Sequence, residues 1–391
     1  MSSIEDLIAE YCPNGVEFKR LGDIVRIRNG KDHKSLGDGE FPVYGSGGIM
    51  RYADTFAYNK PSVLIPRKGT LGNLFFVDVP FWTVDTIFYT EIDETQVLPK
   101  YLYYFLTTVG LGEMNQAGGV PSQTQSVLNE LRIPIPCPDS PKRSLEIQAE
   151  IVRILDAFCA LTAELTAELY LRKKQYNHYR NQLLSFEEGD VEWKPLCKLT
   201  EYSQARISYT ELDSSNYVGV ESLLQNRAGK TDSIRTPESG NLTQYVANDI
   251  LIGNIRPYLK KIWYADRTGG TNGDVLVIHP TDAAVNPRYL YQVLADDKFF
   301  EYNMQHAKGA KMPRGNKQKI MEYLVPIPLA NDTEKSLAEQ ARIVTILDKF
   351  DALTSSITQG LPREIELRQK QYEYYRDLLL SFPKPDAEVA A

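Results

Sequence analysis

Apolar side chains recur at every third or fourth position along a stretch in the middle of the chain. They are Ile151, Ile154, Leu155, Phe158, Leu161, Leu165, Leu169, Tyr176, Tyr179 and Leu183. This spacing predicts one long amphipathic helix whose apolar side forms a coiled-coil-like seam. The same spacing returns near the C-terminus, at Ile343, Ile346, Leu347, Phe350, Leu353, Ile357, Tyr372, Tyr375 and Leu379. Gly360–Pro362 interrupts the second pattern, so we expect a kink or a break of the helix there.

The two helical stretches are copies of each other. The blocks SLEIQAEIVRILDAF (Ser144–Phe158) and SLAEQARIVTILDKF (Ser336–Phe350) match at ten of fifteen positions, at an offset of 192. The blocks RKKQYNHYRNQLLSF (Arg172–Phe186) and RQKQYEYYRDLLLSF (Arg368–Phe382) also match at ten of fifteen positions, at an offset of 196. The difference of four residues corresponds to one extra helical turn in the second copy.

A serine stands at the start of each copy. Ser336 with Glu339 fits a capping box, in which the serine caps the helix and the glutamate bonds back to it. Ser144 is followed by Ile147 at that spacing, so only the capping serine is present there. We therefore expect both serines at helix N-caps.

The repeat extends into the segments that precede each helix. Three further pairs match in the same order: VEFK (16–19) with VEWK (191–194), PKYLYYFL (99–106) with PRYLYQVL (287–294), and IPIP (133–136) with VPIP (325–328). The material between these pairs is dissimilar. The duplication therefore predicts two unlike modules held on one repeated frame.

Short strand-like runs separated by glycine, serine and asparagine characterise both modules. They lie at 62–65, 74–77, 87–91, 250–252 and 275–278, and the PxYLYxxL blocks are typical of a short helix on a sheet. We predict an α+β fold, with a first module at 1–136, a helical region at 137–190, a second module at 191–328 and a second helical region at 329–391.

Burial of the two seams against each other predicts an antiparallel coiled coil with pseudo-two-fold symmetry. The residues expected to pair are Ile151, Leu155, Phe158, Leu165, Ile343, Leu347, Phe350 and Ile357. A helix pair buried inside one large domain is the alternative.

Composition is that of an ordinary soluble protein, 42% apolar and 24% charged. The sequence contains no run of eighteen apolar residues, so we expect no membrane span. The N-terminus does not resemble a signal peptide. The cysteines lack metal-site spacing, so we expect free thiols in a cytoplasmic protein. The net charge of −7 argues mildly against nucleic acid, but His306–Lys319 holds five basic residues and no acid.

Motifs for catalysis are missing from the sequence. There is no GxGxxG, no GxxxxGK[ST] and no histidine spacing typical of a metal site. The chain also lacks the catalytic tetrapeptide of amino-methyltransferases and the acidic motif of common nucleases. We therefore expect no active site, no metal and no cofactor in this chain.

Basic, amide and hydroxyl side chains on loops are the candidate functional residues. Arginine and lysine can hold phosphates or read guanine, and asparagine and glutamine can read adenine. The candidates for DNA contact are Arg26, Arg28, Lys31, Lys34, Ser46, Arg67, Lys68, Ser122, Gln123, Arg206, Asn254, Arg256, Lys260, Lys308, Lys311, Arg314 and Lys317. For any single residue a solvated loop remains an open alternative, whereas the block Lys308–Lys319 favours nucleic acid.

The chain resembles the specificity (S) subunit of Type I restriction–modification enzymes, and looks most like the IC subfamily. The resemblance rests on Ile133–Phe158, the tandem TAEL at 162–169, Arg172–Phe186 and their second copies. FPVYGSGG (Phe41–Gly48) and the turn Pro66–Gly69 also look like target recognition domains of that family.

The resemblance implies that each of two target recognition domains reads one half of a split site in double-stranded DNA. The paired helices would set the distance between the half-sites and dock two methyltransferase (M) subunits, which carry S-adenosylmethionine and methylate adenine N6. Restriction (R) subunits would add ATP- and Mg-dependent translocation and cleavage, so this subunit would itself be non-catalytic.

Three other functions remain open from the sequence. The first is a single-chain nuclease or methyltransferase, against which the missing motifs argue. The second is a coiled-coil adaptor without DNA contact, and the third is the DNA-reading subunit of a methylation-only system.

Each TAEL unit adds about 6 Å of helix, so we expect each unit to change the half-site spacing by at most about two base pairs.

Overall fold

The computed structural model describes residues 16–114, 121–187, 191–354 and 360–382. The chain divides into two compact units. Unit 1 comprises Met1–Thr162 and Arg368–Ala391, and unit 2 comprises Ala163–Leu367. Each unit therefore combines one module with parts of the helical regions.

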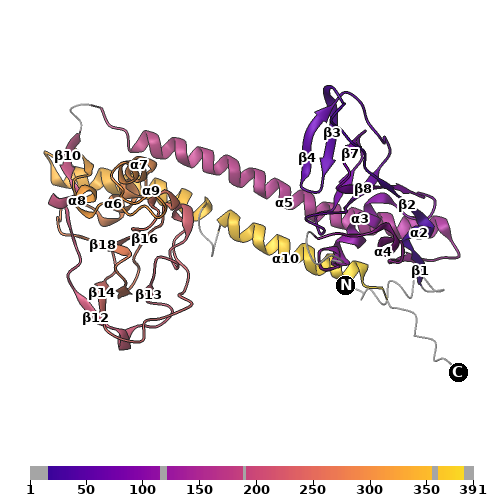
Figure 1. Cartoon of the computed structure of the whole chain (residues 1–391). Helices are drawn as coiled ribbons and strands as arrows, with labels where there is room; N and C mark the ends of the chain where they lie inside the picture. The colour runs from indigo at the N-terminus through magenta and orange to yellow at the C-terminus, as the bar shows by residue number, and fades with distance from the viewer. Residues whose placement is uncertain (1–15, 115–120, 188–190, 355–359, 383–391) are drawn as a thin grey trace. The chain divides into compact units, whose positions relative to one another are not determined.

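Unit 1 holds two sheets and one separate strand pair (Figure 1). The four-stranded sheet is antiparallel throughout, in the order β2 (Val25–Asn29), β8 (Ile87–Ile92), β5 (Ser62–Pro66), β6 (Phe75–Val77). The three-stranded sheet has the order β4 (Gly48–Ala53), β3 (Asp38–Gly45), β7 (Trp82–Thr83). The separate antiparallel pair is β1 (Val16–Arg20) with β9 (Arg132–Pro136). The short helices are α2 (Leu21–Ile24), α3 (Pro99–Thr108), η1 (Leu111–Glu113) and α4 (Gln125–Asn129).

Unit 2 repeats this plan. Its first sheet is antiparallel, in the order β11 (Thr200–Tyr202), β18 (Val275–Pro280), β15 (Ile250–Gly253), β16 (Ile262–Tyr264). Its second sheet has the order β12 (Arg206–Ser208), β14 (Asn241–Tyr245), β17 (Gly269–Thr271), β13 (Tyr217–Val218). The separate antiparallel pair is β10 (Val191–Pro195) with β19 (Leu324–Pro328). The α-helices are α6 (Pro287–Leu294), α7 (Asp297–Gln305) and α8 (Lys317–Met321), and the 3-10 helices are η2 (Leu196–Lys198), η3 (Tyr209–Glu211), η4 (Gln225–Arg227) and η5 (Pro257–Leu259).

The shared plan confirms the α+β class of both modules. The strands predicted at 62–65, 74–77, 87–91, 250–252 and 275–278 are β5, β6, β8, β15 and β18, and both PxYLYxxL blocks are helices. The first and last strands of each module pair with each other, because the entry and exit segments lie side by side. The modules thus begin and end at one place on the frame.

Three long helices make up the frame. They are α5 (Pro141–Leu183), which is continuous over 43 residues, α9 (Thr333–Thr354) and α10 (Gly360–Leu380). The interruption expected at Gly360–Pro362 lies where α10 begins. Gly360 has φ +76° and a Cβ there would lie 2.3 Å from the Ala352 carbonyl oxygen, so only glycine fits. Pro362 falls in the first turn of α10, where proline is tolerated.

The expected serine N-caps are wrong. The helices α5 and α9 begin at Pro141 and Thr333, three residues before Ser144 and Ser336. Proline suits a first helical position, and Asp332 accepts a bond from the Lys335 backbone N–H at 3.1 Å. Both serines are instead buried inside the first turn, each bonded to a glutamine four residues later.

Each unit has a main core that the sheet and the frame helices share. In unit 1 Ile151 and Leu155 of α5 and Leu380 of α10 lie in one cluster with residues of β5, β8 and α3. In unit 2 Ile343 and Leu347 of α9 lie in one cluster with residues of β15, β18 and α6. The four residues expected to pair helix with helix therefore face the module cores, because the helices complete those cores.

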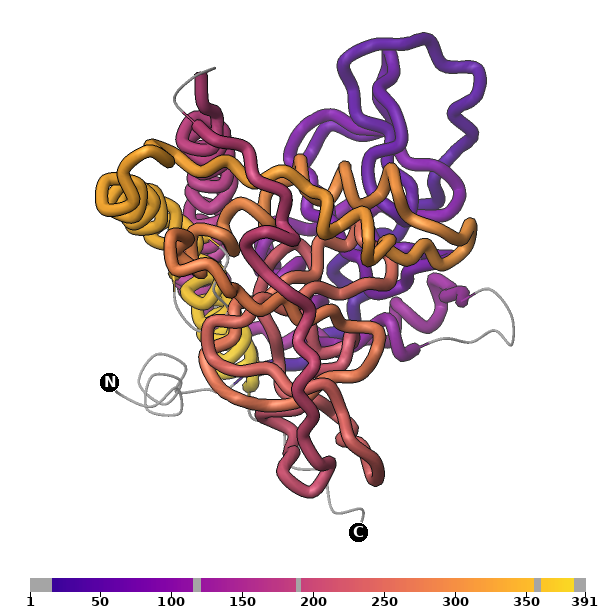
Figure 2. The backbone as a smooth tube through the Cα atoms, turned by 90° about the vertical axis from the view of Figure 1, so that its left-hand side faces the viewer, coloured from indigo at the N-terminus to yellow at the C-terminus, as the bar shows by residue number. Residues whose placement is uncertain are grey.

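Aromatic stacking joins the frame helices to each other inside each unit. In unit 1 the rings of Phe158 and Tyr375 stack at 5.3 Å between centroids. In unit 2, where α9 runs beside the end of α5 (Figures 1 and 2), Phe350 stacks on Tyr176 at 5.7 Å and on Tyr179 at 5.4 Å. Phe158 and Phe350 thus take part in helix pairing. Leu165 is half-buried, and Ile357 lies outside the described residues.

Candidate nucleic-acid interface

The loop after β5 in unit 1 is held by a second, distant loop. The Gly69 N–H donates to the Pro121 carbonyl at 2.9 Å, and the Gln123 N–H donates to the Arg67 carbonyl at 2.9 Å. Gly69 has φ +83°, a conformation that favours glycine. We call these two segments, 67–69 and 121–123, the unit 1 loop pair.

Unit 2 contains the same arrangement after β15. The Arg256 N–H donates to the Pro313 carbonyl at 2.7 Å, and the Gly315 N–H donates to the Asn254 carbonyl at 3.1 Å. The segments 254–256 and 313–315 form the unit 2 loop pair. Since β5 and β15 hold the same place in their sheets, the two loop pairs are equivalent positions of the repeat.

Four predicted residues come together at the unit 1 loop pair. Lys68 is exposed and forms a β-bridge with Ser122, and the Arg67 guanidinium lies 5.7 Å from the centre of the Phe88 ring. Ser46, in the turn between β3 and β4, lies close to Gly69: a Cβ added to Gly69 would be 3.4 Å from the Ser46 Oγ. The result is a patch with two cations and two hydroxyls.

The basic block of the sequence gathers at the unit 2 loop pair. Lys308 and Arg314 exchange two backbone hydrogen bonds, at 2.9 and 2.8 Å, so residues 308–314 form a hairpin. This hairpin docks beside Arg256, and Lys311 lies within it; all four side chains are exposed. Arg314 also pairs with Asp274 at 3.2 Å, which offsets part of the positive charge.

The other predicted cations lie outside the loop pairs. Arg26 and Arg28 are on the exposed side of β2, where Arg28 pairs with Glu91 at 3.0 Å. Lys31 and Lys34 follow that strand and are exposed. In unit 2, Arg206 lies on β12 and Lys317 begins α8, both exposed. Lys260 pairs with Asp297 at 2.7 Å, which neutralises part of its positive charge.

The two amides at the loop pairs are buried. Gln123 is 2% exposed and donates to the Leu111 carbonyl at 2.7 Å. Asn254 is 7% exposed, and within the described part of the chain its Oδ1 has no partner. Residue type suggested base readers, but the side chains point inward. The prediction that these two amides contact DNA is therefore wrong, because neither side chain reaches the surface in the described structure.

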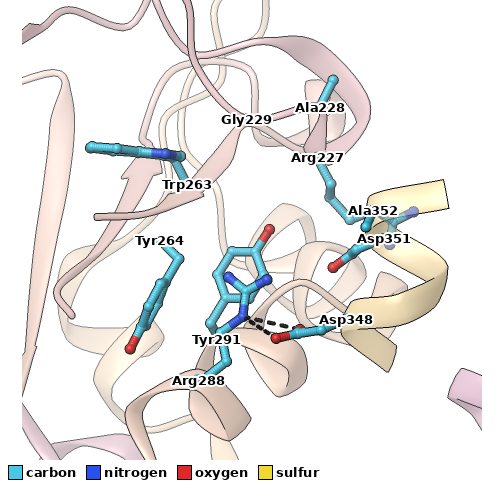
Figure 3. A pocket seen from close by; sticks show the side chains of 10 residues that line it. All are labelled: Arg227, Ala228, Gly229, Trp263, Tyr264, Arg288, Tyr291, Asp348, Asp351 and Ala352. Carbon is cyan, nitrogen blue, oxygen red and sulfur yellow. Dashed lines mark hydrogen bonds and ion pairs between the residues drawn. The ribbon is translucent and has the colours of Figure 1, made fainter. Parts of the chain in front are cut away.

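A cavity of about 250 Å³ in unit 2 lies between the second module and α9 (Figure 3). Arg288 Nε bonds both Asp348 oxygens, at 3.0 and 2.9 Å, and its guanidinium lies over Tyr264 and Tyr291. Burial, with the nearby Asp351 carboxylate, raises the pKa of Tyr291 to about 12, so the phenol stays neutral. The lining residues are Arg227, Ala228, Gly229, Trp263, Tyr264, Arg288, Tyr291, Asp348, Asp351 and Ala352.

The ion pair of this cavity has a counterpart in unit 1. Lys100 of α3 bonds Asp156 of α5 at 2.7 Å and lies 5.5 Å from the Phe76 ring centre. The pairs Lys100–Asp156 and Arg288–Asp348 were missed from the sequence, although all four residues lie in repeated blocks. We assign them to the attachment of the modules rather than to DNA contact.

Within the described ranges, no group of three or more histidine, cysteine or acidic side chains could hold a metal ion. No helix in the same ranges is both long and apolar enough to cross a membrane.

Comparison with known families gives a double match. The family model described as "Type I restriction modification DNA specificity domain" matches residues 13–171 and again 205–367. The specificity subunit of the Type I restriction enzyme EcoR124I/EcoR124II of Escherichia coli is 41% identical over 309 residues, covering 76% of this chain and 74% of that one. A putative Type I specificity subunit of Haemophilus influenzae is 29% identical, covering 94% and 96%.

Solved structures show the same fold. A Type I restriction–modification S subunit from M. genitalium superposes with a TM-score of 0.62 at 16% identity, covering 95% of this chain and 96% of that one. A chain from a study of assembly and conformational transition of the Type I system gives a TM-score of 0.52 at 13% identity, with 94% and 98% covered.

Proposed function

This chain belongs to the family of Type I restriction–modification specificity subunits, and we propose from that premise that each of its units reads one half of a split site in double-stranded DNA. The function of the chain is to give such a complex its DNA sequence specificity. Catalysis would then belong to other subunits, in agreement with the missing catalytic motifs.

The duplicated loop pair is the observation that carries this proposal. It occurs at equivalent positions of both units, and it presents Lys68 in unit 1 and Arg256 with Lys308 in unit 2. The loops differ in sequence while their backbone pairing is the same. A common scaffold with different exposed side chains is what two readers of different half-sites require.

The frame helices supply the distance between the two readers in this proposal. Support comes from the ring stacks, since Phe158 contacts Tyr375 and the equivalent Phe350 contacts Tyr179. In each case the early part of one copy meets the late part of the other. That exchange is the pairing expected of an antiparallel coiled coil.

Two methyltransferase subunits would dock on the frame, one at each copy of the repeat. The exposed apolar side chains Tyr374 and Leu378 of α10 lie four residues apart on one helix face, 65% and 37% exposed. Partner subunits would carry S-adenosylmethionine for adenine N6 methylation, and restriction subunits would use ATP and Mg for cleavage. We place the complex in the cytoplasm.

Membership of the IC subfamily is a finer part of the proposal. It rests on the helical blocks 144–158 and 172–186, on their second copies, and on the tandem TAEL. The methylation-only alternative makes the same DNA contacts, so a cleavage assay with ATP separates the two.

Methylome sequencing of the host tests the proposed function. With the chain and its methyltransferase present, methylated adenines are expected in two short sequences separated by a fixed, unspecified gap. Deletion of the chain should remove that methylation completely. A contiguous methylated motif, or a motif that survives the deletion, would refute the proposal.

A further inference from the structure

A buried glutamine of α5 ties the frame to the module in unit 1. Gln148 is fully buried, and its Oε1 accepts a bond from the Leu98 backbone N–H at 2.8 Å. Its Nε2 donates to the Gln96 carbonyl at 3.0 Å and to the Ser144 Oγ at 3.1 Å. One side chain thereby holds the loop that leads directly into α3.

Gln340 of α9 does the same in unit 2. It is fully buried, and its Oε1 accepts from the Asn286 N–H at 2.8 Å. Its Nε2 donates to the Ala284 carbonyl at 3.1 Å and to the Ser336 Oγ at 3.0 Å. The same two amide atoms make the same three hydrogen bonds to equivalent partners, in modules whose loops otherwise differ. We call Gln148 and Gln340 the attachment glutamines.

The short helix that follows each held loop continues the connection to the sheet. The Tyr101 hydroxyl of α3 donates to the Pro134 carbonyl at 2.8 Å, and the Tyr289 hydroxyl of α6 donates to the Pro326 carbonyl at 2.8 Å. The acceptors lie on β9 and β19, the last strands of the modules. In each unit, hydrogen bonds therefore connect the frame helix to the loop before the short helix, and the short helix to the last strand of the module.

Stability alone does not require a glutamine at these positions. Burial of an amide is costly unless its groups are bonded, and an apolar side chain of similar volume could fill the same space. Apolar contacts are non-directional, whereas three hydrogen bonds to fixed partners define an orientation. The amide thus contributes a unique angle and register of the module on its helix.

We propose that Gln148 and Gln340 are positioning residues that fix each recognition module on its frame helix and so set how strictly the complex selects the gap between half-sites. The inference rests on the proposed split site and adds the residues that make its gap strict. One added base pair displaces a half-site by about 3.4 Å and turns it by about 35°. A rigid attachment rejects such a site, and a loosened one accepts it.

The test uses the full chain in complex with its methyltransferase. Duplexes carry both half-sequences from the methylome, separated by the native gap or by one base pair more or fewer. The variants are Gln148→Ala and Gln340→Ala, with Ser144→Ala and Ser336→Ala as milder changes that each remove one bond to the amide. Gln369→Ala is the matched control, since Gln369 is exposed and its amide donates to Glu373 on the same helix, at 3.1 Å.

Each glutamine variant is expected to raise methylation at the altered gaps, relative to the native gap, by on the order of tenfold. The serine variants should give a smaller rise, and the control none, with both half-sequences unchanged throughout. An unchanged gap ratio with lower overall activity would overturn the inference, and so would complete loss of methylation in both kinds of variant. If wild-type methylation is not split at all, the proposed function itself fails.

Discussion

Insertion of a third TAEL unit after Leu169 should lengthen the gap between the half-sites. The present units occupy 162–169 inside the continuous helix α5, where none of the eight residues is buried. Alanine, leucine and glutamate are good helix formers, so the insertion should extend the helix without breaking it. Four residues also add about 400° of turn, which returns the seam to within about 40° of its former direction.

The magnitude follows from helix and DNA geometry. Four residues at about 1.5 Å each lengthen the helix by about 6 Å, and base pairs are about 3.4 Å apart. The expected change is therefore an increase of one or two base pairs in the gap, with both half-sequences retained. Deletion of residues 166–169 should shorten the gap by the same amount.

Methylome sequencing of strains that carry each variant measures the gap directly. Glu164→Gln combined with Glu168→Gln is the matched control, because it changes the charge of both units and keeps the helix length. An active insertion variant with the native gap would refute the idea that α5 sets the spacing. A changed half-sequence would refute the separation of reading from spacing.

Three further predictions concern the loop pairs. The double variant Lys308→Ala, Lys311→Ala should weaken DNA binding by the complex. It should also reduce the slope of log K against log salt by up to about 1.8, since each phosphate contact contributes about 0.9. Lys349→Ala is the control, and an unchanged slope in the double variant would exclude contact of these two lysines with phosphates. Gly69→Ala should lower the free energy of unfolding by about 1–2 kcal/mol in chemical denaturation, because φ +83° is unfavourable for a residue with a Cβ. Gly47→Ala is the control and should leave the free energy of unfolding unchanged, since no atom lies within 4 Å of the added Cβ. Gln123→Ala should cost about 0.5–1.5 kcal/mol, because it removes the 2.7 Å bond to the Leu111 carbonyl and leaves that acceptor the longer bond from the Met114 N–H at 3.3 Å. A changed half-sequence in that variant would contradict its structural role.

Periodicity and duplication in the sequence predicted the frame and much of each module. The strands at 62–65 and 275–278 and both PxYLYxxL helices were found because their apolar patterns match their burial. Loop pairing was not predictable, since the hydrogen bonds between 67–69 and 121–123 join segments about fifty residues apart. No local pattern indicates such a partner.

The type of a residue indicates what its side chain can bind, but not whether that side chain points to solvent or into the interior. The residue types of Gln123 and Asn254 predict base readers, yet both side chains point into the interior because backbone pairing fixes the loop around them. The attachment glutamines were overlooked for the opposite reason, as polar side chains in an amphipathic helix are expected to face water. Their recurrence at an offset of 192 was the signal available in the sequence.

A module swap followed by methylome sequencing tests the central claim most directly. Residues 16–136, which begin with β1 and end with its partner β9, would be replaced by the corresponding module of a relative with a different target. The account predicts that one half-sequence changes to that of the donor, while the other half-sequence and the gap stay as they are. A change in both half-sequences, or in neither, would contradict the claim that each unit reads its own half-site.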